Sequence, residues 1–351
     1  MHRLILALAV VVAVVAGFVQ RTSAQSLTFT LFERYLDSLR EQAGIPGMSA
    51  LISQGRTEVW SAGLGRADVE GNLRPTPDTP YLIGDLSQTI GATLLLKECI
   101  DESYAELNDP VAEWITGFPE RDSTIAMLLA HIAPGGAFRY DLGRFALLTP
   151  IIENCSDNPY SPLLHEEIFQ QLSMDNSVPG TAIVTPTATE LRQFEQRDVS
   201  RFAVVLSQMA TPYHVDRGRH VRSSLARVGV NAASGIVTTV RDFSKFDAML
   251  DINDDRGLIE PETLARAWES LGSNRPAGLG WFLQSYNREP VVWQFGVVPN
   301  AYSTLVVKVP NRQLTFILFA NSDALAAPFS REIWDVTASA FAKLFLVTFV
   351  P

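Results

Sequence analysis

The chain has 351 residues, of which 47% are hydrophobic and 19% are charged. This length and composition supply enough apolar side chains for a large core in one or two domains, which excludes an intrinsically disordered protein. The net charge at pH 7 is −10, and the sequence has no cluster of Lys or Arg that would form a basic patch. These features argue against a nucleic acid or an anionic membrane surface as the partner.

The first 24 residues have the pattern of a signal peptide. His2 and Arg3 precede an apolar run from Leu4 to Phe18, and Thr22-Ser23-Ala24 places small residues before Gln25. The run is shorter than the ~20 apolar residues of a membrane-spanning helix. We therefore expect cleavage near Gln25, a secreted or periplasmic protein and no transmembrane span in the mature chain. An uncleaved anchor is the alternative.

Hydrophobic periodicity predicts strands near both ends of the mature chain and helices between them. In chain order we expect a helix at Leu27–Ala43, a hairpin of Met48–Gln54 and Thr57–Gly63, helices at Leu86–Ile100, from Pro110, at Thr124–His131, Arg144–Asn154, Ser161–Leu172, Val199–Met209 and Val240–Leu250, strands at Leu279–Tyr286, Val291–Gly296, Tyr302–Val309 and Leu314–Asn321, and a last helix at Phe329–Phe345. This order indicates an α/β (α+β) fold, in which one antiparallel sheet is flanked by helices and a helical lobe is inserted. The sheet part should cover about 25–75 and 230–351, and the lobe about 76–229.

Cys99 and Cys155 are the only two cysteines of the chain. A bridge is chemically possible in an oxidising compartment, but each lies within an apolar helical pattern. Free cysteine behaves as a small core hydrophobe, so we interpret the pair as two separate buried thiols. Neither has the spacing of a metal or redox motif. His214, Asp216 and His220 lie close in sequence but lack the register of a metal site. We expect no metal and no cofactor.

The turn before the second predicted helix is a candidate site. An extended segment from Asp78 to Ile83 runs into this helix, and a helix N-terminus favours developing negative charge. Enzymes often place a nucleophile at such a position. This chain has Asp85 there, with Gln88 three residues later.

Short motifs in this order and spacing resemble the serine β-lactamase and penicillin-binding-protein-like superfamily, in the branch of the class C β-lactamases, D-alanyl-D-alanine carboxypeptidases and related esterases. The resemblance implies a β-lactamase/transpeptidase-like fold over nearly the whole mature chain. It rests on Ile45-Pro46-Gly47, Asp78-Thr79-Pro80-Tyr81, Leu107-Asn108-Asp109-Pro110-Val111, Leu128-Leu129-Ala130-His131, the Ile168–Met174 stretch, Gly278-Leu279-Gly280-Trp281 and Phe319-Ala320-Asn321-Ser322. His131 matches a structural position, and we expect a buried histidine with satisfied hydrogen bonds.

The resemblance implies three clusters that converge on one pocket: Ser-x-x-Lys, Tyr-x-Asn, and a strand with Lys-Thr-Gly or His-x-Gly. Flanking matches place Asp85 and Gln88 at the serine and lysine positions. Ser87 cannot replace the serine, because two residues along a helix rotate the side chain by about 200°. The second cluster keeps its tyrosine and loses its asparagine, and the third loses its cation. The pocket positions are then Asp85, Gln88, Tyr140, Leu142, Gln294, Phe295 and Gly296.

Each cluster has therefore lost a functional group, while the surrounding frame is kept. Nucleophilic catalysis needs a nucleophile and a base together. We expect a secreted pseudoenzyme without an intact catalytic residue, whose pocket holds a neutral or hydrophobic small ligand or a protein partner near the cell envelope. The alternative is a weak hydrolase or esterase that uses Asp85 and Tyr140 on an uncharged substrate.

Overall fold

A computed structural model describes residues 27–184, 193–272, 276–329 and 334–351. The predicted signal peptide, residues 1–24, lies outside these ranges. Within them, every helix is too short or too polar to span a lipid bilayer.

Six antiparallel strands form the main sheet, in the order β2-β1-β11-β10-β9-β8. The first two strands come from the first part of the described chain and the other four from its last part, as the strand pattern predicted. Met48 pairs with Ala320, so the two ends of the chain meet in the middle of the sheet. The strands are β1 (Gly47–Gln54), β2 (Thr57–Gly65), β8 (Phe282–Tyr286), β9 (Glu289–Val298), β10 (Tyr302–Val309) and β11 (Leu314–Ala320).

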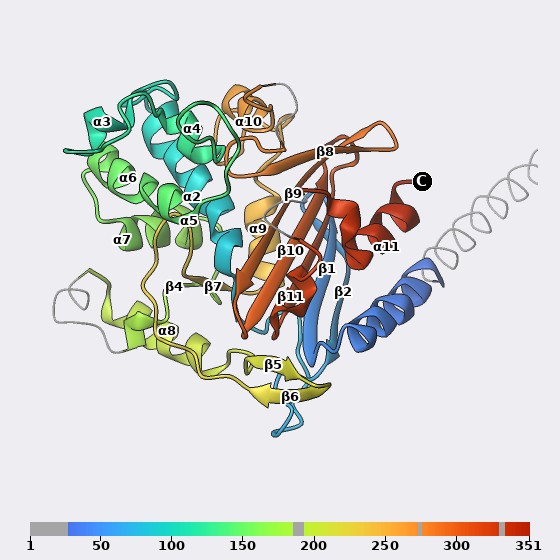
Figure 1. The fold of residues 1–351 in the computed structure, drawn as a ribbon. Coiled ribbons are helices and arrows are strands. Elements are labelled where there is room, and N and C mark those ends of the chain that lie inside the picture. The colour runs from blue at the N-terminus through green and yellow to red at the C-terminus, as the bar shows by residue number, and fades with distance from the viewer. Residues whose placement is uncertain (1–26, 185–192, 273–275, 330–333) are drawn as a thin grey trace, which may run out of the picture.

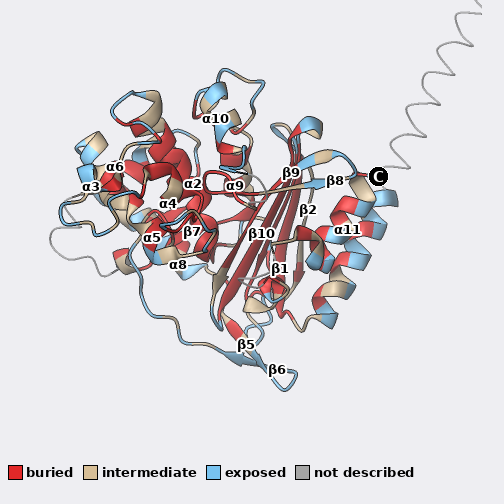
Figure 2. Cartoon of the chain, turned by 45° about the horizontal axis from the view of Figure 1, so that its top comes forward, coloured by how far each residue is buried: buried red, intermediate tan, exposed pale blue. Residues whose placement is uncertain are grey.

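Two layers of helices cover the sheet (Figures 1 and 2). The helix at residues 27–42 and α11 (Ala340–Phe349) pack on one face, where they share a core with Trp293 and Phe295 of β9. The lobe packs on the other face, against Val292 and Val306. Because neighbouring strand residues point to opposite faces, Gln294 and Gly296 face the lobe.

Helix α2 (Ser87–Leu95) lies in the centre of the lobe, and all of its residues are buried. A 3-10 turn, η1 (Gly84–Leu86), leads into it, and a π-helical turn, η2 (Leu96–Asp101), follows it. Around it lie α3 (Val111–Trp114), α4 (Ile125–Leu129), α5 (Leu142–Ala146), α6 (Leu148–Ser156), α7 (Tyr160–Leu164), η3 (His165–Gln170), η4 (Ala182–Val184) and α8 (Gln196–Ser207).

Shorter elements connect the lobe to the sheet. A small sheet has the order β3-β7-β4, and a separate hairpin joins β5 to β6. The bounds are β3 (Tyr81–Leu82), β4 (Val178–Pro179), β5 (Tyr213–Asp216), β6 (Arg219–Arg222), β7 (Ile236–Thr238), α9 (Val240–Asp247), α10 (Pro261–Ala267), η6 (Pro310–Arg312), η7 (Asp323–Ala326) and η8 (Val336–Ala338). The hairpin and α10 have no counterpart among the predicted elements.

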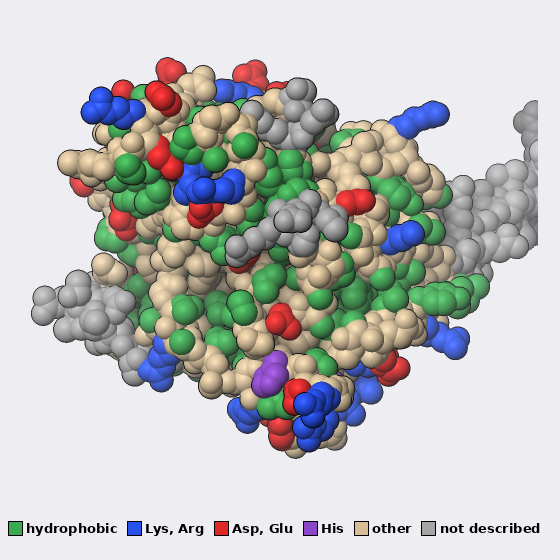
Figure 3. Space-filling model, viewed as in Figure 1, with side chains coloured by type: hydrophobic (Ala, Val, Ile, Leu, Met, Phe, Trp, Pro, Cys, Tyr) green, Lys and Arg blue, Asp and Glu red, His purple; other side chains and the backbone are tan. Residues whose placement is uncertain are grey.

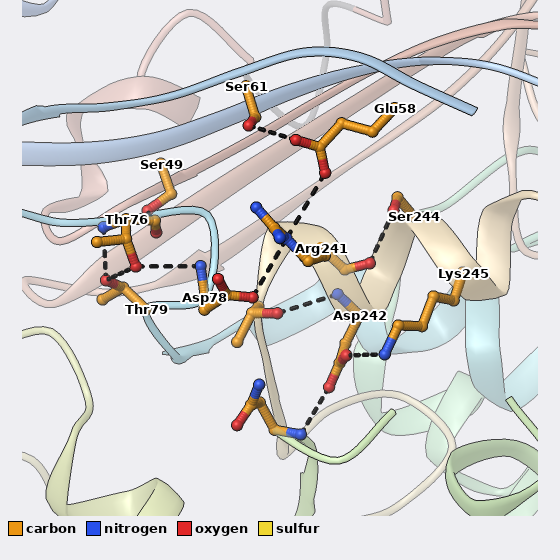
Figure 4. Close-up of polar contacts among 12 residues, drawn as sticks. Ser49, Glu58, Ser61, Thr76, Asp78, Thr79, Arg241, Asp242, Ser244 and Lys245 are labelled. Carbon is orange, nitrogen blue, oxygen red and sulfur yellow. Dashed lines mark hydrogen bonds and ion pairs between the residues drawn. The ribbon is translucent and has the colours of Figure 1, made fainter. Parts of the chain in front are cut away.

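Polar contacts fix the segment that leads into η1 (Figure 4). Arg241 at the start of α9 lies 3.2 Å from the Asp78 carboxylate and 3.6 Å from that of Glu58 on β2. The Thr79 hydroxyl accepts a hydrogen bond from the backbone N–H of Thr76. These contacts hold the chain between β2 and α9 just before the turn that carries Asp85.

Two sequence-based predictions were wrong. The last helix begins at Ala340 rather than Phe329, because the Ser339 side chain accepts a hydrogen bond from the Ala342 N–H and caps it there. Cys99 and Cys155 form a disulfide, with their Cα atoms 5.5 Å apart. It joins η2 to α6 across the interior of the lobe. The fold class predicted from the sequence is confirmed.

Candidate functional site

The η1 turn is pressed against strand β9. Gly84 has a φ of 56°, in the left-handed region that favours glycine. A Cβ atom added there would lie 2.7 Å from the Val297 carbonyl oxygen, and one added at Gly296 would overlap the Ile83 carbonyl. Both glycines are therefore needed for the close approach of turn and strand. This contact holds Asp85 in a fixed place, where it is only 7% exposed.

A chain of hydrogen bonds ends on the Asp85 carboxylate. The Tyr140 hydroxyl donates to Asp85 Oδ2 across 3.0 Å, and Gln88 Nε2 donates to the Tyr140 oxygen across 2.9 Å. Gln88 Oε1 lies 2.8 Å from Nε2 of His131. The backbone N–H of Asp141 donates to Nδ1 of the same imidazole across 3.1 Å. The chain thus joins the first turn of α2 to the loop before α5.

The backbone N–H of Asp141 fixes the direction of every hydrogen bond in this chain. A backbone N–H can only donate, so Nδ1 of His131 is an acceptor and the ring proton lies on Nε2. Burial lowers the pKa of His131 to about 3, which keeps the ring neutral near pH 7. Nε2 therefore donates to Gln88 Oε1, and each later donor points towards Asp85. The arrangement stabilises negative charge on that carboxylate.

Aromatic side chains surround the phenol of Tyr140. Its ring centroid lies 4.4 Å from His131, 5.4 Å from Trp334, 6.0 Å from Phe282 and 6.1 Å from Phe295. Phe295 belongs to the core on the terminal-helix face of the sheet. Its ring stacks on that of Tyr140. The side chain of Gln294, the preceding residue, points to the opposite face of the sheet.

The side chain of Gln294 is bonded to backbone groups. Its Nε2 donates to the Gly280 carbonyl across 3.3 Å, and its Oε1 accepts from the Phe295 N–H across 3.0 Å. It is 1% exposed. Lys308 of β10 is a buried cation on the same sheet face, but its ammonium group lies 3.0 Å from the Asp247 carboxylate. Neither side chain replaces the cation that the family places at the Gln294 position.

Leu142 lies at the edge of a surface hollow. The hollow has a volume of about 520 Å³ and is lined by Phe138, Arg139, Tyr140, Asp141, Leu142 and Gly143. Asp141 caps α5, because its carboxylate accepts from the Arg144 N–H across 3.1 Å. Figure 3 shows hydrophobic side chains near the junction between lobe and sheet on this face of the molecule.

The other candidate residues lie apart from this site. Ser87 accepts a hydrogen bond from the Ile236 N–H across 3.3 Å, so it points away from Asp85, as the helical rotation predicted. His214 bonds to Ser223, and His220 bonds to the Gly44 carbonyl. Across the described ranges no three His, Cys, Asp or Glu side chains are grouped as metal ligands.

Comparison with known proteins decides the family. The family model described as Beta-lactamase matches residues 32–339. The chain belongs to the β-lactamase family.

Curated relatives of this family member match only parts of it. The human mitochondrial serine beta-lactamase-like protein LACTB is 30% identical over 105 residues, which are 28% of this chain and 19% of the relative. The D-alanyl-D-alanine-carboxypeptidase/endopeptidase AmpH of Escherichia coli K12 is 23% identical over 205 residues, 46% of this chain and 51% of the relative. The matches thus span about half of the relatives' length or less.

Solved structures show the same fold over nearly the whole chain. The octameric penicillin-binding protein homologue from Pyrococcus abyssi has a TM-score of 0.72 at 20% identity, with 91% of this chain and 77% of that chain covered. The class C beta lactamase from Rhodobacter sphaeroides has a TM-score of 0.67 at 16% identity, with 91% and 99% covered. At these identities the likeness concerns the fold.

Sequence reasoning placed Asp85, Gln88 and Tyr140 in one site, and the structure brings them together. His131 is buried with both ring nitrogens hydrogen-bonded, as predicted, but its bond to Gln88 was not predicted. Trp334 packs at a tilt beside Tyr140 and lies far from it in the chain. No spacing rule connects either residue to the η1 turn.

Proposed function

We propose that this β-lactamase family member is a catalytically inactive binding protein. The observation that carries the proposal is the direction of the hydrogen bonds at Tyr140. Its proton points to Asp85, and its oxygen accepts from Gln88. A general base needs a free lone pair directed at the proton that it removes. Here the tyrosine donates to the very position where the family has its nucleophile.

The replaced side chains support the same reading. A nucleophilic serine needs a neighbouring base that accepts its proton, and Gln88 offers an uncharged amide instead of a lysine. The Asp85 carboxylate could in principle attack a substrate, because carboxylates act as nucleophiles in other enzymes. However, the Tyr140 hydroxyl donates to Asp85 and stabilises negative charge on the carboxylate, which lowers its reactivity.

The ligand we propose is neutral or apolar. β-Lactams and peptide C-termini carry a carboxylate, which the Asp85 charge would repel, and the family's cationic positions hold Gln88 and Gln294. The aromatic rings around Tyr140 and the apolar side chain of Leu142 favour a ligand that presents an uncharged surface to them. A protein partner that inserts an apolar side chain beside Tyr140 and Leu142 would fit this site equally well.

We propose that the protein works outside the cytoplasm. The signal-peptide pattern of residues 1–24 predicts export. The bond between Cys99 and Cys155 supports it, because disulfides persist in oxidising compartments.

Activity assays on the purified mature protein test the proposal. We expect no labelling by fluorescent penicillin or by a fluorophosphonate, and no turnover of a chromogenic β-lactam or a p-nitrophenyl ester. Steady turnover that Asp85→Ala or Tyr140→Phe abolishes would instead establish the weak hydrolase that uses these two residues. Tyr104→Phe, at a side chain that is 64% exposed, is the matched control for the tyrosine substitution.

A thermal-shift panel of uncharged and carboxylate-bearing compounds tests the ligand class. A ligand that binds the folded protein raises its stability by RT ln(1 + [L]/Kd). We expect shifts from neutral aromatic or aliphatic compounds, and Asp85→Asn should extend them to carboxylates. Shifts from carboxylates in the unchanged protein would contradict the proposed ligand class.

A further inference from the structure

A buried ion pair lies away from the Asp85 site, between the sheet and the end of α9. The ammonium group of Lys308 donates to the carboxylate Oδ2 and to the backbone carbonyl of Asp247, each across 3.0 Å. The two side chains are 8% and 2% exposed. Two N–H groups of the lysine are therefore used, and one is left for a further partner.

Two polar atoms beside this pair lack a partner. Among the residues that the structure describes, none donates a hydrogen bond to Oδ1 of Asp247, and none accepts one from the indole Nε1 of Trp268. Lys308 Nζ lies 5.9 Å from the centroid of the Trp268 ring, so the three side chains are neighbours. Buried polar groups in folded proteins are nearly always hydrogen-bonded, to protein atoms or to an ordered water.

The same three side chains line one small cavity. Its volume is about 20 Å³, and its wall also includes Asp251, which is partly exposed, and Gln313, which is exposed. A cavity needs about 10–15 Å³ to hold one water, and the water needs two to four polar partners. The cavity therefore has room for a single small molecule, and its partly exposed wall gives solvent a route in.

We propose that this cavity binds one water molecule. The water donates a hydrogen bond to Asp247 Oδ1 and accepts one from Trp268 Nε1, with the remaining N–H of Lys308 as a second donor. A molecule in this cavity must both donate a hydrogen bond to Asp247 Oδ1 and accept one from Trp268 Nε1. An ammonium ion has no lone pair for the indole and is repelled by Lys308, whereas a halide ion cannot donate to the carboxylate.

The bound water links three elements that are distant in the sequence. Asp247 ends α9, Lys308 lies in β10, and Trp268 directly follows α10. Ala267, the last residue of α10, accepts a hydrogen bond from the Leu279 N–H. The water therefore ties α10 to the sheet, and it completes the hydrogen bonding of the buried charge pair.

A high-resolution crystal structure of the whole mature protein tests the proposal. We expect density for one water within hydrogen-bond distance of both Asp247 Oδ1 and Trp268 Nε1. A cavity without density, or with density that contacts only one of these two atoms, would overturn it.

Magnetic relaxation dispersion of water nuclei tests the same site in solution, because it counts long-lived internal waters. Trp268→Phe removes the indole donor and should lower the count by one. Trp60→Phe is the matched control, since its indole N–H donates to the Glu33 carboxylate and does not line this cavity. An unchanged count in Trp268→Phe, or an equal loss in both folded variants, would contradict the proposal.

Discussion

The hydroxyl of Tyr140 donates a hydrogen bond to the carboxylate of Asp85 across 3.0 Å, although the two residues are 55 positions apart in the chain. This bond connects the turn before α2 to the loop before α5. In the family, the corresponding positions hold a nucleophile and a base. Here they hold an acceptor and its donor, an arrangement that supports the proposed binding function.

Replacing Tyr140 by phenylalanine should destabilise the fold. The substitution keeps the ring contacts but removes the donor to Asp85 and the acceptor of Gln88 Nε2. Hydrogen bonds to charged groups contribute about 1.5–3 kcal/mol. We expect the free energy of unfolding in urea to fall by about 2 kcal/mol. A loss no larger than that of the exposed control Tyr104→Phe would show that the chain of hydrogen bonds adds little stability.

Stability should depend on pH through His131. Burial lowers the pKa of His131 to about 3 in the folded protein, whereas an unfolded histidine titrates near pH 6.5. Between these values the unfolded chain binds a proton that the folded chain does not. Stability is therefore complete above about pH 6.5 and is lost as the pH falls towards 3. Between pH 7 and pH 5 we expect a loss of about 2 kcal/mol from this group.

Urea unfolding of His131→Gln at several pH values measures this contribution. The slope of stability against pH reports how many protons are taken up on unfolding. Towards pH 5 this number should be smaller by nearly one in the variant than in the parent. Burial also lowers the pKa of His165, which adds to the slope in the same direction in both proteins. His220→Gln, at an exposed residue, is the control for the replacement of a histidine by glutamine. An unaltered slope in His131→Gln would contradict the prediction.

The frame of the site could be predicted because it depends on local patterns. The apolar segment Tyr302–Val309, bounded by turn residues, was predicted as a strand and has these bounds in the structure. The residues around Asp85 matched the residues that flank the family's nucleophile. This match placed Asp85 in the turn before α2 and Gln88 in its first turn. Position in a helix then gave the direction of Ser87.

The partners of these residues could not be predicted, because they come from distant parts of the chain. His131 reaches Gln88 across 43 positions, and its tautomer depends on a backbone N–H. Cys99 and Cys155 read as buried apolar residues whether they are bonded or free. Phe295 points away from Gln294 along the strand, and its contact with the Tyr140 ring at 6.1 Å depends on the fold.

Removing the disulfide should cost substantial stability. The bond closes a loop across 56 positions, for which the chain-entropy relation gives about 4 kcal/mol. We expect the Cys99→Ala, Cys155→Ala double variant to lose on the order of 3–4 kcal/mol in denaturant unfolding. Reductant should destabilise the parent protein and leave the variant unchanged. Two titratable thiols in the unfolded, unreduced parent would contradict this prediction.

Restoring the family's residues tests whether the frame of the site is still competent. The resemblance places a histidine at the His131 position beside the family's Ser-x-x-Lys turn, so His131 should not prevent a lysine at the Gln88 position. The Asp85→Ser, Gln88→Lys, Leu142→Asn variant again has a nucleophile and a base, and we expect slow labelling by fluorescent penicillin, which the parent should not show. Asp85→Asn, Gln88→Lys, Leu142→Asn has the base without the nucleophile and is the matched control. No labelling of the folded first variant would mean that the site has lost more than these three side chains.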